Sequence, residues 1–161
     1  MGSSDSTALL WEASTGVCSR VLEGHEAGIT SVAWTPYGSA LATASKDHTA
    51  RLWSATTGDV THRLEPHGAA VWAVACSPDG GFIATGFGDQ STRVWNRSTG
   101  ALMRALEGHA DSVRSVAGTP VDGICFLHQR MAHCACTEAH VDRGLASLTT
   151  FSVASTSRRR S

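Results

Sequence analysis

A histidine, a serine and an aspartate lie in the first third of this 161-residue chain, at His25, Ser45 and Asp47. These residue types can serve as base, nucleophile and orienting acid in acyl transfer. Part of the set returns 42 residues later, at His67 and Asp89. An enzyme needs one such site, whereas a recurring set indicates a structural role. We therefore expect no catalytic residues and no enzymatic activity.

Thiol and imidazole side chains gather near the C-terminus and are potential zinc ligands. They are His128, His133, Cys134, Cys136 and His140. A Cys-x-Cys pair with irregularly placed histidines does not have the spacing of a zinc finger. We expect no metal site here, and no other pattern in the chain indicates a cofactor.

The composition of the chain argues against several classes of protein. The formal net charge of −1 argues against a general nucleic-acid or membrane-surface binder. No stretch approaches the ~20 apolar residues that cross a bilayer, and the small, polar N-terminus does not resemble a secretory signal. Five irregularly spaced cysteines do not predict a disulfide framework. These features favour an intracellular protein, either cytoplasmic or nuclear.

A strict internal repeat dominates the sequence. Trp11, Trp53 and Trp95 are 42 residues apart (53 − 11 and 95 − 53). Other columns keep the same interval, namely Asp5/Asp47/Asp89, Gly16/Gly58/Gly100, Leu22/Leu64/Leu106, His25/His67/His109 and Pro36/Pro78/Pro120. A fixed period of this length is typical of repeat architectures.

Each unit predicts four short strands. No segment before residue 124 keeps a helical apolar period, and turn residues punctuate β-prone runs. In the clearest unit the predicted strands are 29–34, 40–45, 49–53 and 60–64. Four antiparallel strands in about 40 residues, repeated in tandem, are typical of propeller blades.

The repeated motifs resemble those of the WD-repeat family. They are Leu10-Trp11-Glu12, Gly24-His25, Leu52-Trp53-Ser54, Val94-Trp95-Asn96 and Gly108-His109, with an aspartate at 5, 47 and 89. The aspartate that usually follows the tryptophan is absent from all three units. The resemblance covers residues 1–123 and implies an all-β fold: an incomplete β-propeller arc of four-stranded antiparallel blades, with an irregular C-terminal tail.

The resemblance also implies a hydrogen-bonded polar network inside each blade. In one unit it would comprise His25, Ser45, Asp47 and Trp53, with the indole donating to the serine hydroxyl. In the next it would comprise His67, Asp89 and Trp95. Phe87 stands where Ser45 is matched, so Thr85, two residues upstream, is the candidate substitute in that unit.

Partners of WD-repeat proteins often bind the face that carries the loop before the innermost strand and the turn between the second and third strands. The matching residues are Thr30, Lys46, Trp72, Gly88, Ser112 and Arg114. Trp72 differs from its polar counterparts Thr30 and Arg114. An exposed tryptophan near cations has the composition of an interaction hot spot. The alternative is that Trp72 only packs on the next blade.

The repeat predicts two regions of the chain. Residues 1–123 would form a partial blade (1–22), blades at about 27–64 and 69–106, and a further partial blade (112–123). Residues 124–161 would form a non-repeat, weakly ordered tail, although 124–127 aligns with a second strand. Three blades are too few for ordinary closure, so open strand edges are expected.

These expectations favour a protein–protein interaction scaffold that binds other proteins or peptides, as a fragment or truncated form of a larger propeller protein. One alternative is a chain that completes a propeller by self-association or association with another chain through its open edges. Another is a truncated product with little independent function. Nucleic-acid and membrane partners are not expected.

Overall fold

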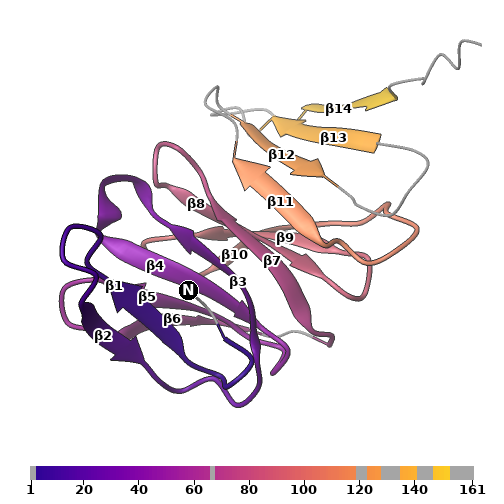
Figure 1. The fold of residues 1–161 in the computed structure, drawn as a ribbon. Coiled ribbons are helices and arrows are strands. Elements are labelled where there is room, and N and C mark those ends of the chain that lie inside the picture. The colour runs from indigo at the N-terminus through magenta and orange to yellow at the C-terminus, as the bar shows by residue number, and fades with distance from the viewer. Residues whose placement is uncertain (1–2, 66–67, 119–122, 128–134, 141–146, 153–161) are drawn as a thin grey trace, which may run out of the picture.

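The computed structural model describes residues 3–65 and 68–118, and the backbone of three further strands between 123 and 152. The described chain is built from antiparallel sheets (Figure 1). Its one helical element is the short 3₁₀ turn η1 (Pro36–Gly38). This arrangement confirms the predicted all-β class.

Four sheets follow one another along the chain. Half-blade 1 contains β1 (Ala8–Trp11) and β2 (Cys18–Leu22). Blade 2 contains β3 (Ile29–Trp34), β4 (Ala40–Ser45), β5 (Ala50–Ser54) and β6 (Val60–Leu64). Blade 3 contains β7 (Val71–Cys76), β8 (Phe82–Phe87), β9 (Thr92–Asn96) and β10 (Leu102–Leu106). Blade 4 contains β11 (Ser115–Gly118), β12 (Gly123–Leu127), β13 (Ala135–His140) and β14 (Ser147–Ser152).

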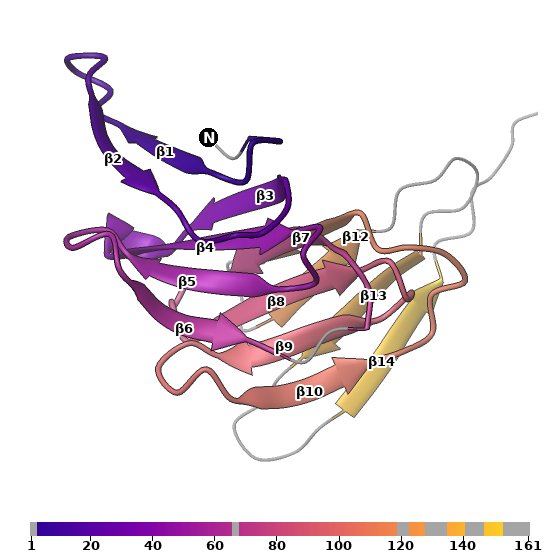
Figure 2. The same ribbon diagram turned by 90° about the horizontal axis from the view of Figure 1, so that it is seen from below.

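Successive sheets stack face to face, as Figure 2 shows for half-blade 1 and blades 2 and 3. The innermost strands are neighbours, with β3 beside β7 and β7 beside β11. Hydrogen bonds also link neighbouring blades. The Thr30 hydroxyl donates to the Val71 carbonyl at 2.6 Å, and the amide of Val113, in the loop before β11, donates to the Phe87 carbonyl at 2.9 Å. This radial stacking positions the turns of neighbouring blades side by side.

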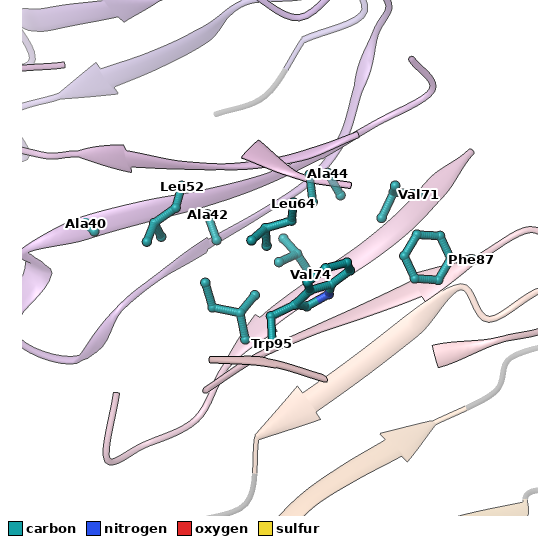
Figure 3. Packing of buried hydrophobic residues seen from close by; sticks show 11 residues of the cluster. Ala40, Ala42, Ala44, Leu52, Leu64, Val71, Val74, Phe87 and Trp95 are labelled. Carbon is teal, nitrogen blue, oxygen red and sulfur yellow. The ribbon is translucent and has the colours of Figure 1, made fainter. Parts of the chain in front are cut away.

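The main core lies between blades 2 and 3 (Figure 3). β4 contributes the small side chains of Ala40, Ala42 and Ala44, and blade 3 contributes the larger Phe87 and Trp95. Small residues on one sheet leave room for large residues on the next, which allows dense packing. Every residue of β4 is buried because this middle strand has a neighbouring sheet on each side.

The strands of blade 2 lie where the repeat predicts them, except that the third is shifted by one residue, from 49–53 to Ala50–Ser54. The C-terminal region differs more. Segments 135–140 and 147–152, expected to belong to an irregular tail, are strands β13 and β14, which extend the sheet started by β11 and β12. Strand pairing uses backbone groups that every sequence carries, so an open strand edge can recruit a segment that has no repeat motif.

Candidate protein-binding face and the buried polar network

The turn between the second and third strands is organised by an aspartate. In blade 2 the Asp47 Oδ1 atom accepts hydrogen bonds from the Thr49 amide at 2.9 Å and the Thr49 hydroxyl at 2.7 Å. His48 between them takes a left-handed conformation with φ of 69°. Asp5 with Thr7, and Asp89 with Ser91, make the same two bonds in the neighbouring units. The side chain thus closes each hairpin locally.

Blade 2 also contains a continuous chain of hydrogen bonds between four side chains. The Trp53 indole N–H donates to the Thr43 hydroxyl at 2.8 Å, and this hydroxyl lies 2.7 Å from His25 Nε2. His25 Nδ1 lies 2.7 Å from Asp47 Oδ2. A carboxylate only accepts, so Nδ1 carries the imidazole proton and Nε2 accepts from the Thr43 hydroxyl. Each hydrogen bond in this series is therefore donated in the direction from Trp53 to Asp47.

Burial and hydrogen bonding explain the protonation states of His25 and Asp47. Burial lowers the pKa of His25 and outweighs the opposing effect of Asp47, so the neutral imidazole is favoured. Burial alone would raise the pKa of Asp47, but hydrogen bonds from Thr49, His25 and the Glu26 amide lower it to about 2. A neutral histidine beside an ionised aspartate is the state that these hydrogen bonds require.

The structure corrects the hydroxyl assigned to this network. Ser45 does not bond Trp53 or His25; its hydroxyl donates to the Ala27 carbonyl at 2.8 Å and accepts from the Asp47 amide. Thr43 and Ser45 lie two residues apart on β4 and so point to the same face of the strand. The 42-residue period distinguishes them, because Thr43 is matched by Thr85 whereas Ser45 is matched by Phe87.

Blade 3 uses the matching threonine. The Trp95 indole donates to the Thr85 hydroxyl at 2.8 Å, so the candidate substitute occupies the regular position of the repeat. His67, the expected imidazole of this unit, lies outside the described residues. Asp89 closes its turn through Ser91 and lies 3.7 Å from the guanidinium of Arg93. The Asp89 side chain is more exposed than that of Asp47, at 35% against 5%.

The Thr43, His25 and Asp47 side chains have the connectivity of a hydrolytic triad, but the surroundings argue against such a role. The Thr43 side chain is fully buried, and its oxygen already accepts the Trp53 indole proton. A nucleophile must reach its substrate. Buried in this way, the side chains are placed to hold strands together.

Of the residues predicted for the candidate binding face, Lys46, Gly88, Ser112 and Arg114 lie in loops or turns, whereas Thr30 and Trp72 lie near the starts of β3 and β7. The Lys46 amide donates to the Gly28 carbonyl at 3.1 Å, and the Gly88 amide donates to the Ala70 carbonyl at 3.0 Å. The Ser112 hydroxyl reaches the Gly88 carbonyl at 3.3 Å. Thr30 is half-buried, and its hydroxyl bonds Val71 of the next blade.

Trp72 of this face is half-buried. The Lys46 ammonium lies 5.9 Å from its ring centroid, and the Arg114 guanidinium carbon lies 5.1 Å from it. Both cations are at exposed residues. Gly88 borders the ring closely, since a Cβ there would lie 3.1 Å from the indole nitrogen. Three consecutive blades thus each contribute one residue to a Lys–Trp–Arg cluster, formed by Lys46, Trp72 and Arg114.

Other site types find no support within the part of the chain that the structure describes. No group of three or more His, Cys, Asp or Glu side chains there could hold a metal ion. Cys18 and Cys76 are both free thiols. In the same residues, no helix is long and apolar enough to span a membrane.

The fold defines a repeat protein built from propeller blades. Two segments, residues 16–54 and 58–96, match the family model "WD domain, G-beta repeat". The chain belongs to the WD-repeat family. A comparison with curated proteins gave no match.

Solved structures show the same architecture. "Structure of U3-55K" aligns with a TM-score of 0.80 at 19% identity, covering 85% of this chain and 44% of that chain. "Crystal structure of RRP9 WD40 repeats" aligns with a TM-score of 0.79 at 19% identity, covering 84% of this chain and 42% of that chain. The chain therefore spans less than half the length of either structure, and the likeness concerns the fold alone.

Proposed function

We propose that this chain is a non-enzymatic scaffold that binds other proteins or peptides through the Lys–Trp–Arg cluster. The observation that carries the proposal is the convergence of two exposed cations on one half-buried indole, from three successive blades. Tryptophan and arginine are enriched in the residues that dominate binding energy at protein interfaces. WD repeats, to which this chain belongs, are widely used for protein binding.

The cluster is suited to a protein partner more than to nucleic acid. The chain has a net charge of −1, so it lacks the general positive field that drives binding to phosphate backbones. A half-buried ring offers apolar area, and the flanking cations favour acidic or carbonyl-rich segments. An intracellular location, cytoplasmic or nuclear, and derivation from a larger propeller protein remain parts of this proposal.

Pull-down with purified variants tests the proposal. Trp72→Ala, Lys46→Ala and Arg114→Ala should each reduce recovery of the partners that the unmodified chain captures. Tyr37→Ala is the matched control, because Tyr37 is a fully exposed aromatic residue. It lies before the start of β4, whereas Lys46 follows the end of that strand. Unchanged recovery with all three cluster variants, at unchanged thermal stability, would exclude this face as the binding surface.

A further inference from the structure

Arg51 of β5 is a buried cation without a partner of opposite charge. The residue is only 8% exposed. Within the part of the chain that the structure describes, its guanidinium donates no hydrogen bond and forms no ion pair, and its Nε is completely enclosed. The guanidinium carbon lies 6.0 Å from the centroid of the Trp53 ring. A buried charge is costly unless it is paired and hydrogen-bonded, so an anion bound here would stabilise the chain.

A second guanidinium lies directly across from Arg51. Arg63 on β6 is opposite Arg51 in the antiparallel register, so the two side chains leave the sheet on the same face. Like charges placed opposite each other repel. Burial is the main cause of the low pKa of His25, and the charges of Arg51 and Arg63 lower this pKa further. Both cations therefore lie close enough to the imidazole to act on it.

Part of this Arg51–Arg63 pair is accessible from solvent. The Arg63 side chain is 51% exposed. Only Nε of Arg51 is both enclosed and unpartnered, which leaves the two terminal nitrogens within reach of a ligand. Gly24, in the linker between β2 and β3, lies against one of them, since a Cβ there would lie 2.5 Å from Nη1. A small anion can therefore contact both guanidiniums.

Blade 3 has a different arrangement at the matching positions. Arg93 corresponds to Arg51, but it lies 3.7 Å from the Asp89 carboxylate. Ala105 stands where Arg63 is matched, opposite Arg93 on the adjacent strand. Between these two blades, only blade 2 has an arginine without an acidic partner and a second arginine across from it. The repeat fold does not require such a pair.

Glu65 competes for one of the two cations. Its carboxylate forms an ion pair with Arg63 Nε, and both side chains are about half exposed. Ion pairs between exposed side chains contribute little to stability, because water and salt screen them. An anion that binds both guanidiniums can therefore displace Glu65 from Arg63.

We propose that the Arg51–Arg63 pair binds a phosphate group. A guanidinium presents its donors in a planar fork that fits two oxygens of a phosphate, and a phosphate has enough oxygens for two such forks. A carboxylate has only two oxygens and one negative charge, so it matches one guanidinium better than two. Inorganic phosphate and a phosphorylated side chain of a partner share this chemistry. The pair has no residue in common with the Lys–Trp–Arg cluster, so the two proposals can fail independently.

NMR titration of the full chain with inorganic phosphate, at constant ionic strength, tests the proposal. The Arg51 Nε–H signal should shift saturably, because a bound phosphate polarises the guanidinium. Acetate should bind at least about 5-fold more weakly, since it cannot engage both forks. A capped glycine–phosphoserine–glycine peptide distinguishes the sources. Tighter binding of this peptide than of inorganic phosphate indicates a phosphorylated partner, and weaker binding indicates the free ion.

Matched variants distinguish the pair from the overall charge of the chain. Arg63→Ala reproduces the alanine of blade 3 and should weaken phosphate binding about 5- to 10-fold, because one set of charged donors is lost. Arg104→Ala removes the same charge from an exposed position on β10 and should leave binding unchanged. Glu65→Gln should strengthen binding, because the competing carboxylate is removed.

Three results would overturn the proposal. One is an Arg51 Nε–H signal that phosphate leaves unchanged or shifts without saturation. Another is equal weakening by Arg63→Ala and Arg104→Ala, which would indicate attraction by overall charge alone. The third is acetate binding as tight as that of phosphate. Trp72→Ala should leave phosphate binding unchanged, so that variant tests the Lys–Trp–Arg cluster separately.

Discussion

β1 and β5 carry the same repeat column but lie in contrasting surroundings. Trp53 of β5 is buried and bonded, whereas Trp11 of β1 is half exposed and lacks the threonine contact. The sequences are matched, so the difference arises from the strands beside them. In this fold, the residue type alone does not decide whether a side chain is buried. Burial also depends on the neighbouring strand and the neighbouring blade.

The same comparison distinguishes hydrogen bonds between residues close in sequence from those between distant residues. The aspartate turn forms in half-blade 1 and in blades 2 and 3 alike, because its donors lie two residues away along the chain. The Trp53–Thr43–His25–Asp47 chain joins residues up to 28 positions apart (53 − 25) and depends on the inner strands of its blade. The polar network is thus a property of the assembled blade.

The largest expected effect contrasts the two tryptophans. Trp53→Ala should lower the free energy of unfolding by about 3–5 kcal/mol, because it empties a buried site and leaves Thr43 without its donor. Trp11→Ala should lower the free energy of unfolding by no more than about 1 kcal/mol, since Trp11 is already 52% exposed. Urea midpoints measure both, and equal losses would remove the distinction between β1 and β5.

The free energy of unfolding lost on replacing each aspartate by alanine should be larger for the more buried aspartate. Asp47→Ala should cost about 2–3 kcal/mol because it leaves the His25 N–H and backbone amides unsatisfied in a buried site. Asp89→Ala should cost about 1 kcal/mol, since that side chain is a third exposed. Urea denaturation checks the ranking, with the exposed Asp59→Ala as control; a cost for Asp89 equal to that for Asp47 would contradict it.

Acid should remove the Asp47 contribution within a defined pH range. The pKa of about 2 in the folded chain lies below the ordinary value of ~3.9, so the folded state resists protonation. The stabilisation is complete above pH ~4 and is lost as the pH falls towards 2, amounting to about 2 kcal/mol. The stability difference between the unmodified chain and Asp47→Asn should shrink across this range. A difference that stays constant with pH would show that Asp47 has an ordinary pKa.

The smallest expected effect tests the hydroxyl assignment. Thr43→Val should cost about 1–2 kcal/mol and speed exchange of the Trp53 indole proton, because valine keeps the shape but cannot accept a hydrogen bond. Ser45→Ala should leave the indole exchange rate unchanged, whatever its cost in stability. NMR exchange measures both variants, and a faster Trp53 indole in Ser45→Ala would restore the original assignment.

Much of the fold could be predicted from the sequence because the repeat supplies its own alignment. Three matched units fix where the tryptophans, turns and apolar runs lie, and the β3, β4 and β6 boundaries follow. The network hydroxyl was misassigned because Thr43 and Ser45 share one strand face, and a single unit cannot choose between them. The Thr43/Thr85 column identifies the network hydroxyl. A separate column, the hydroxyls at 7, 49 and 91, identifies the partners of the turn aspartates.

Two features were beyond sequence reasoning for physical reasons. Strands β13 and β14 have no repeat motif, and β13 pairs through backbone groups with the edge of β12. The two cations near the Trp72 ring, Lys46 and Arg114, lie 26 and 42 residues away along the chain (72 − 46 and 114 − 72). Only the radial stacking of blades brings these cations onto one ring.

Indole proton exchange of the three repeat tryptophans tests the central comparison most directly. In the chain alone, the Trp53 and Trp95 N–H signals should persist in deuterated solvent, since each donates to a buried threonine. The Trp11 signal should vanish at the rate of an exposed indole. Similar exchange at all three positions would contradict the view that the inner strands of each blade, and not the repeated residues themselves, create its bonded core.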